Sequence, residues 1–329
     1  FIADSYHPGI LIKHSFHFIY KIKGENFECV YHPSAFPFEL IEKKGNWPVF
    51  DGRNLETSKA DFETAVSNVV EAIKAKKVQK VVLSRATKRP LASGFTPITF
   101  LKKLIFSYKN AFISLLATEK TGTWIGATPE ILVNVDKANI FKTISLAGTK
   151  CKDPDSKTSE TLWSQKEIEE QALVSRYIIN CFKKIRVREF DEIGPKTIEA
   201  GDLLHLKTEF YVDQNQINFE NLAGVMLNLL HPTSAVCGMP KGEALEIIND
   251  LEKHQRAYFT GFLGPVGISP NESLSTQTNI FVNIRCMQLL EKEAVFYAGA
   301  GITEDSIPEK EYDETLNKIN TLLKIFEGI

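Results

Sequence analysis

The order of the predicted strands and helices constrains the fold of this chain more strongly than any other feature of its sequence. Apolar, β-branched segments typical of strands occur at 80–88, 111–118, 123–135, 138–148, 202–212, 281–290 and 293–302. Helical periodicity occurs at 61–77, at about 164–184 and at about 309–326. Because strands follow one another in runs, with helices between the runs, the pattern favours an α+β fold with largely antiparallel sheets over a doubly wound fold.

The composition excludes several classes of protein. A chain of 329 residues with 43% hydrophobic residues can bury a large core, as one large domain or two ordinary ones. Its net charge of −2 argues against a protein that binds nucleic acid by neutralising phosphates. We find neither an apolar run of the roughly 18 residues needed for a membrane span nor a secretory signal. Five dispersed cysteines, none in a CxxC motif, predict reduced thiols and a cytoplasmic protein.

Two pairs of glutamates stand out on two predicted helices. Glu167 and Glu170 are three residues apart, as are Glu311 and Glu314, so each pair shares a helical face. The face of Glu170 continues as an apolar stripe, which directs this pair toward the interior or a cleft. Oxygen ligands without His or Cys suit Mg²⁺. The alternative is that both pairs lie on solvated helix surfaces, where the Glu314–Lys318 spacing is common.

Lys80 and Glu130 are candidates for proton transfer. Lys80 begins a predicted strand on the same face as Val82, and burial of that face in a cleft would make the lysine a usable base. Glu130 follows Pro129 at the start of an apolar run, where burial would keep its carboxyl group protonated as an acid. The alternative is structural: a solvated lysine at a strand end and a glutamate in a turn.

The glycines do not form a nucleotide-binding motif. Gly299 and Gly301 follow a predicted strand, but Glu304 replaces the third glycine of a dinucleotide fingerprint, and a P-loop is absent from the sequence. We interpret Gly299–Gly301 as a bare loop whose N–H groups can approach an anion. Arg285, on the preceding strand, is positioned to clamp a carboxylate.

Ten sequence blocks, in order, resemble those of the chorismate-utilising enzymes, a family that includes isochorismate, salicylate, anthranilate and aminodeoxychorismate synthases. They are KVVLSR, GATPEILV, SLAGTK, KEIEEQ, HLKTEF, HPTSAVCGMPK, EKHQRAYFTGFLG, FVNIRC, AGAGI and PEKEYDETLNK, between Lys80 and Lys318. The resemblance implies large antiparallel sheets flanked by helices, with an active-site cleft between them. It implies a chorismate-binding catalytic domain at 56–329. Residues 1–55 match poorly and are expected to form a strand-rich part of the same domain.

The resemblance also implies roles for individual residues. Lys80 matches the lysine that activates water, and Glu130 matches the acid that protonates the departing hydroxyl group. The implied Mg²⁺ ligands are Glu170 and Glu314, assisted through water by Glu167 and Glu311. The implied substrate-binding residues are Gly148, Thr149, His205, Ala235, Tyr258, Arg285, Gly299, Ala300, Gly301 and Lys318.

Single positions separate the members of this family. Ala147 stands where aminodeoxychorismate synthases with a nucleophilic lysine carry that lysine, so the covalent route is not expected. The LLES motif of anthranilate synthases is not found in the sequence, and Ala235 follows the isochorismate synthase pattern. Gln171 is a departure, because many members have His at this position.

The sequence therefore predicts an isochorismate synthase, an Mg²⁺-dependent isomerase that converts chorismate to isochorismate for menaquinone or siderophore biosynthesis. We expect a monomer that requires no glutaminase subunit and binds neither nucleic acid nor membrane. The alternatives are a salicylate synthase, an anthranilate synthase large subunit and a non-catalytic chorismate-binding subunit.

Overall fold

The computed structural model describes residues 56–118, 121–152, 158, 161–200, 203–219, 221–267 and 277–329. The predictions made for residues 1–55 lie outside these ranges. Within them, no helix has the length and apolar character needed to cross a membrane.

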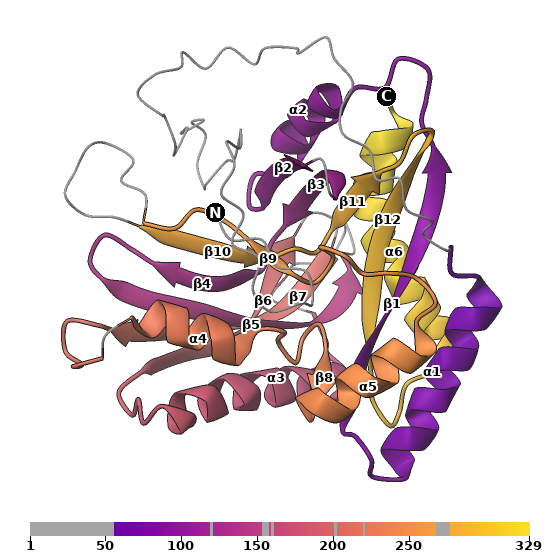
Figure 1. The fold of residues 1–329 in the computed structure, drawn as a ribbon. Coiled ribbons are helices and arrows are strands. Elements are labelled where there is room, and N and C mark those ends of the chain that lie inside the picture. Colours follow the sequence, from indigo (N-terminus) through magenta and orange to yellow (C-terminus); the bar gives the residue numbers. More distant parts are fainter. Residues whose placement is uncertain are drawn as a thin grey trace, which may run out of the picture.

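Two six-stranded antiparallel sheets form the centre of the molecule (Figure 1). The first sheet has the order β2 (Phe112–Thr118), β3 (Gly122–Thr128), β11 (Cys286–Leu289), β12 (Glu293–Ile302), β1 (Lys80–Pro90) and β8 (Gly238–Met239). The second has the order β6 (Asp191–Ala200), β7 (Leu203–Asp213), β5 (Ile140–Cys151), β4 (Ile131–Val135), β10 (Thr278–Val282) and β9 (Phe262–Leu263). The predicted α+β fold with antiparallel sheets is confirmed.

Six helices in the described residues cover the outer faces of the two sheets. Those on the first sheet are α1 (Lys59–Lys74), α2 (Pro97–Ser107), α5 (Lys241–Leu251) and α6 (Pro308–Glu327). Those on the second sheet are α3 (Gln165–Lys184) and α4 (Leu222–Leu230). Figure 1 shows α3 and α4 at the lower left, beneath β4 and β5, and α1 at the lower right, beside β1.

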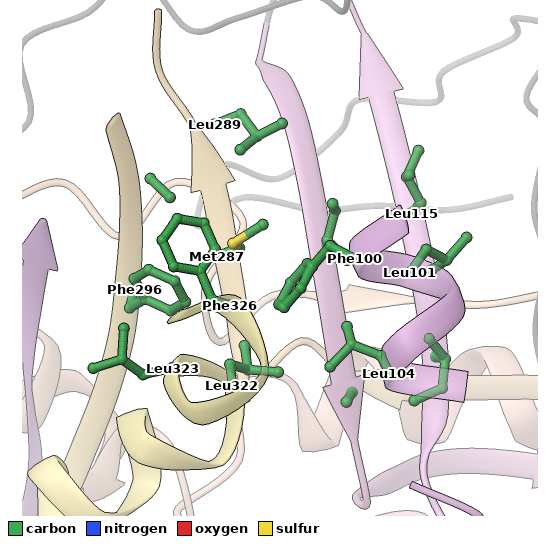
Figure 2. Close-up of a cluster of buried hydrophobic side chains, with 14 of the residues drawn as sticks. Phe100, Leu101, Leu104, Leu115, Met287, Leu289, Phe296, Leu322, Leu323 and Phe326 are labelled. Carbon is green, nitrogen blue, oxygen red and sulfur yellow. The ribbon is translucent and has the colours of Figure 1, made fainter. Parts of the chain in front are cut away.

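The C-terminal helix α6 is held on the first sheet by a cluster of buried side chains (Figure 2). The Phe326 ring lies 5.1 Å from Phe296 on β12 and 5.9 Å from Phe100 on α2, measured between ring centroids. Leu322 and Leu323 enter the same cluster. Because α6 also carries Glu311, Glu314 and Lys318 near its beginning, this packing positions candidate site residues.

The inner faces of the two sheets meet in a second, aromatic cluster. Phe112 on β2 stacks on Phe281 on β10, with ring centroids 4.2 Å apart. Tyr297 on β12 stacks on Trp124 and Phe259 at 5.4 Å. Successive side chains of a strand point to opposite faces of the sheet, which explains why neighbouring residues belong to different clusters. Along β12, Phe296 packs outward against α6 while Tyr297 points between the sheets.

Two segments that were each predicted as one strand cross from one sheet to the other. The predicted strand 123–135 breaks after Thr128 into β3 and β4, since Pro129 has no N–H to continue a ladder. The predicted strand 281–290 breaks into β10 and β11 at a residue with positive φ, Arg285 (φ 50°). The crossovers lie side by side: the N–H of Val282 donates to the Glu130 carbonyl at 3.0 Å, and the N–H of Ala127 donates to the Arg285 carbonyl at 2.9 Å.

Other predictions are corrected in detail. Helices α2, α4 and α5 and the two-residue strands β8 and β9 were not predicted, because short segments give weak periodicity. Strand β6 was not predicted, because its sequence DEIGPKTIEA is largely polar and contains Gly-Pro. Gly299–Gly301, predicted both within the strand 293–302 and as a bare loop, is the last part of strand β12, paired with β1. The predicted helices at 164–184 and 309–326 are confirmed as α3 and α6.

The packing of Phe326 yields a test of stability. We expect Phe326→Ala to lower the free energy of unfolding by about 3–5 kcal/mol, because it empties a site between three aromatic rings. Urea denaturation measures this change. Leu162→Ala is the control, since Leu162 is 86% exposed and its truncation should change stability by no more than about 0.5 kcal/mol. Equal effects of the two substitutions would contradict the packing described here.

Candidate active site

A polar cavity of about 60 Å³, here called the central cavity, lies between the sheets beside the two crossovers. It is lined by these predicted site residues: Glu130, Gly148, Thr149, Glu170, His205, Ala235, Arg285, Gly299, Gly301, Glu314 and Lys318. Residues far apart in the sequence, from strands of both sheets and from α3 and α6, are thus brought to one place. The predicted site residues that do not line it are Lys80, Glu167, Tyr258, Ala300 and Glu311.

Lys80 lies immediately behind the cavity wall in an ion pair with Glu170. Its Nζ is 2.8 Å from Glu170 Oε1, and the lysine side chain is completely buried. Gly301 makes room for this pair, since a Cβ there would lie 2.2 Å from Glu170 Oε1 and 2.9 Å from Lys80 Cε. Burial alone would raise the pKa of Glu170, but the Lys80 ammonium, together with Lys166 and Lys318, holds that pKa below its usual value.

The face of β1 that carries Lys80 points toward the site, as predicted. Val82, on the same face, lines the cavity, whereas Val81 and Leu83 pack on the opposite side against the α1 and α5 cluster. The interpretation of Lys80 as a solvated strand-end residue is therefore wrong.

Glu130 provides an acid that is still partly protonated near pH 7. It lies in the crossover after Pro129 and is 4% exposed. Burial raises the pKa of Glu130 to about 7, although Arg285, Lys80 and Lys318 oppose that rise. A carboxyl group in this state can donate a proton under physiological conditions.

His205 on β7 is held in one tautomer. Its Nδ1 lies 2.8 Å from the Gly148 carbonyl, which can only accept, so Nδ1 carries the hydrogen. Burial and the nearby Arg285 lower the pKa of His205 to about 3, which keeps the ring neutral. Its Nε2 is buried without a hydrogen-bond partner and is an acceptor available to a ligand.

Arg285 supplies positive charge to the same cavity. Burial lowers the pKa of its guanidinium to about 10, although the Glu314 and Glu130 carboxylates oppose that fall. The group therefore remains charged at neutral pH. Its place in the β10–β11 crossover directs it to the side of the cavity that also holds Pro129 and Glu130. A half-buried cation at this point suits a carboxylate ligand.

Glutamates from α3 and α6 form the acidic side of the site. Lys318 Nζ lies 2.6 Å from Glu314 Oε1 and donates to the Gly299 carbonyl at 2.8 Å. Glu311 pairs with Lys166 from α3. Burial, together with the neighbouring Glu314 carboxylate, raises the pKa of Glu311. The two helix ends thus face each other through a network of charges.

The acidic side of the site has part of what a divalent cation requires. In the described ranges, no group of three or more His, Cys, Asp or Glu side chains is arranged as a metal site. One observation nevertheless fits a hard cation: Glu311 Oε2 is buried without a hydrogen-bond partner. Mg²⁺ commonly uses one or two carboxylates and completes its shell with water and substrate oxygens.

Three of the predicted residues outside the cavity have structural contacts instead. Tyr258 is 6% exposed and packs on Trp124 at 5.7 Å, so it does not reach the cavity. Ala300 is buried on the outer face of β12, because strand alternation separates it from Gly299 and Gly301. The Glu167 carboxylate caps α3, where it accepts from the Ser164 N–H at 2.7 Å.

The sequence did not identify several residues of the cavity wall. They include Val82, Phe259, Thr260 and Tyr297. Tyr297 lies on the inner face of β12 with Gly299 and Gly301, so its alternation with them was the available signal. Gln171, the departure noted in the sequence, donates to Thr208 Oγ1 at 2.9 Å behind the site.

Comparisons with known proteins agree with this geometry. The family model described as "Chorismate binding enzyme" matches residues 43–327. The vibriobactin-specific isochorismate synthase of Vibrio cholerae is 28% identical over 80% of this chain, which spans 65% of that relative's length. Anthranilate synthase component 1 of Aquifex aeolicus is 27% identical over 88% of the chain and 56% of its own length. Among solved structures, a putative 2,3-dihydroxybenzoate-specific isochorismate synthase of Bacillus anthracis has a TM-score of 0.71 at 28% identity, covering 84% of this chain and 75% of its own.

The burial of Glu130 predicts a pH-dependent effect on stability. Because the pKa of Glu130 is about 7 in the folded protein and 4.5 is its ordinary value, the unfolded chain loses this proton first as pH rises. Glu130 therefore destabilises the fold increasingly from about pH 4.5 to 7, by roughly 3 kcal/mol at most. We expect Glu130→Gln to be more stable than the parent protein at pH 8 and equal to it near pH 4.5.

Urea denaturation at the two pH values measures this difference. Glu246→Gln, at an exposed position of α5, is the matched control and should show no such pH-dependent gain. A Glu130→Gln variant with the same stability difference at both pH values would show that Glu130 does not titrate as described.

Proposed function

Because the chain belongs to the chorismate binding enzyme family, we propose that it is an isochorismate synthase, which isomerises chorismate to isochorismate. The observation that carries the proposal is that Glu130 and the Arg285 guanidinium line the central cavity while Lys80 lies immediately behind its wall. An exchange of hydroxyl groups requires a proton donor and a proton acceptor at the same site.

The proposed reaction assigns one proton transfer to each of these residues. Lys80 takes a proton from water as the water oxygen bonds to C2 of chorismate. The ring double bonds shift, the C4–oxygen bond breaks, and Glu130 gives its proton to the departing hydroxyl group, which leaves as water. Atoms and charge balance over the two transfers, and a proton passes from Lys80 to Glu130 through solvent before the next turnover.

The ion pair of Lys80 with Glu170 sets a condition on this scheme. Lys80 Nζ lies behind the cavity wall and contacts the Glu170 carboxylate at 2.8 Å, so this ion pair stands between the proposed base and a water molecule in the cavity. The central cavity also has room for only a few waters in its present form. Substrate binding must therefore rearrange the ion-paired side chains, drawing Glu170 away from Lys80.

Two further residues are proposed to orient the substrate. Arg285 binds a carboxylate of chorismate, since its guanidinium lines the cavity beside Glu130 and stays charged at neutral pH. His205 accepts a hydrogen bond at Nε2 from a hydroxyl group or water and does not act as a base, because its pKa is about 3. Both side chains act by holding the substrate in a reactive position.

We propose that Glu170 and Glu314 bind Mg²⁺, with Glu311 assisting. When bound, Mg²⁺ would supply positive charge next to the substrate carboxylate and offset the charge of the glutamates. Glu167 contributes by capping α3, which carries Glu170, and the cap occupies the carboxylate that was predicted to assist through water.

The related reactions remain the rivals of this proposal. Ala147 lines the cavity in place of a lysine, which argues against a covalent lysine intermediate. Ala235 also lines it, in agreement with the isochorismate synthase pattern. Two of the relatives, from Aquifex aeolicus and Acetivibrio thermocellus, are anthranilate synthase component 1, and a salicylate synthase would use the same residues before eliminating pyruvate.

Product analysis tests the proposed activity. Purified protein incubated with chorismate and Mg²⁺ should produce isochorismate, resolved by HPLC, and EDTA should abolish its formation. Addition of ammonia should not change the product. Anthranilate formed with ammonia, or salicylate with pyruvate, would contradict the assignment and identify the corresponding rival reaction.

Substitution of the two proton-transfer residues tests the scheme. We expect Lys80→Met and Glu130→Gln each to lower kcat by about 10²–10⁴-fold, with circular dichroism unchanged. Lys88→Met is the matched control, because Lys88 lies on the same strand but pairs with Glu293 away from the cavity. Near-normal turnover by either test variant would remove that residue from the mechanism.

A further inference from the structure

Three lysines each contact one carboxylate on the acidic side of the site. Lys80 pairs with Glu170, Lys318 with Glu314, and Lys166 with Glu311. These glutamates are the ones proposed to serve a divalent cation. In the protein without a cation, lysine ammonium groups therefore supply the positive charge that buried carboxylates need.

Lys166 differs from the other two lysines in its surroundings. Lys318 lines the central cavity and Lys80 lies behind its wall, whereas Lys166 lines a separate outer cavity of about 420 Å³. The Lys166 side chain is 22% exposed, compared with 0% for Lys80. Lys166 can thus leave its partner for solvent without crossing the substrate site.

The outer cavity adjoins the central one and is rich in acidic groups. The two share Thr149 and Glu314. Its other acidic residues are Glu167, Asp305, Glu311 and Asp313, against the basic residues Lys166 and Lys310. An acidic recess of this kind concentrates cations near its inner end.

Glu311 is a buried acidic residue of this recess and is incompletely paired. The residue is 1% exposed, one carboxylate oxygen contacts Lys166, and Oε2 is buried without a hydrogen-bond partner. A buried carboxylate with one vacant oxygen is suited to accept a second cation or a cation-bound water. Lys166 also interacts electrostatically with Glu314 and Glu170, so its charge opposes a cation bound to any of the three glutamates.

We propose that Lys166 is a positioning residue that competes with the divalent cation: it holds Glu311 in the cation-free protein and turns out into the outer cavity when the cation enters by that route. The inference rests on the proposed function for the identity of the cation site. The pair with Lys166 keeps α3 and α6 together before the cation binds, and it weakens cation binding in the absence of substrate.

Direct measurement of Mn²⁺ binding tests this role without relying on turnover. With Mn²⁺ alone as the probe, followed by electron paramagnetic resonance, Lys166→Met should bind the ion at least about tenfold more tightly than the parent protein, a difference of about 1.4 kcal/mol. The melting temperature of Lys166→Met should be lower than that of the parent without metal, and Mn²⁺ should raise it more. Lys166→Gln provides the same test if the methionine variant does not fold.

Two control variants distinguish the effect of the Lys166–Glu311 ion pair from the general effect of removing a positive charge. Lys310→Met removes one positive charge from the same outer cavity, at an exposed position, and should change Mn²⁺ affinity by less than about threefold. The double variant Lys166→Met/Glu311→Gln should lose the gain in Mn²⁺ affinity, because it no longer has the carboxylate for which Lys166 and the cation compete.

The outcomes distinguish this inference from the proposed function. If the parent protein binds Mn²⁺ and Lys166→Met binds it no more tightly, the role of Lys166 is overturned while the cation site stands. If the parent and all variants bind no Mn²⁺ and chorismate is converted without metal, both the role of Lys166 and the proposed cation site are overturned.

Discussion

The buried ion pair between Lys80 and Glu170 is the interaction on which the rest of the site depends. It joins strand β1 of the first sheet to helix α3, which packs on the second sheet, and it does so where Gly301 leaves out a side chain. Removing either partner would leave a charge in the interior, which costs several kcal/mol. The pair therefore both holds the two halves of the molecule in register and keeps the proposed base in contact with Glu170 until a ligand rearranges the carboxylates.

The two strand crossovers determine what faces this ion pair. Each breaks its strand at a residue that cannot continue a regular ladder, Pro129 in one case and Arg285 with positive φ in the other. Backbone hydrogen bonds join the crossovers. As a result Glu130 and Arg285 enter the same cavity, one as an acid with a raised pKa and the other as a cation, although they lie far apart in the sequence. Burial between the sheets, rather than any single neighbour, gives Glu130 its raised pKa.

Part of this arrangement could be predicted from the sequence. Helices α3 and α6 have long apolar stripes, and strand β12 follows a continuous β pattern, so their positions were predicted closely. The crossovers could not be predicted, since both halves of each split strand are apolar and only the pairing partners reveal the break. Most site residues came from resemblance to a family, which gives positions but not burial. For this reason Tyr258 and Ala300 were placed in a cavity that their side chains do not reach, and the aromatic wall at Tyr297 was missed.

The central claim is that water adds to the substrate ring while Glu130 releases the original hydroxyl group. Turnover of chorismate in water enriched in ¹⁸O, followed by mass spectrometry of the product, tests it most directly. We predict that the isochorismate formed in the first turnover carries one ¹⁸O atom, bound to C2. Isochorismate without the label would show that the hydroxyl group migrates within the substrate, which would contradict the roles assigned to Lys80 and Glu130.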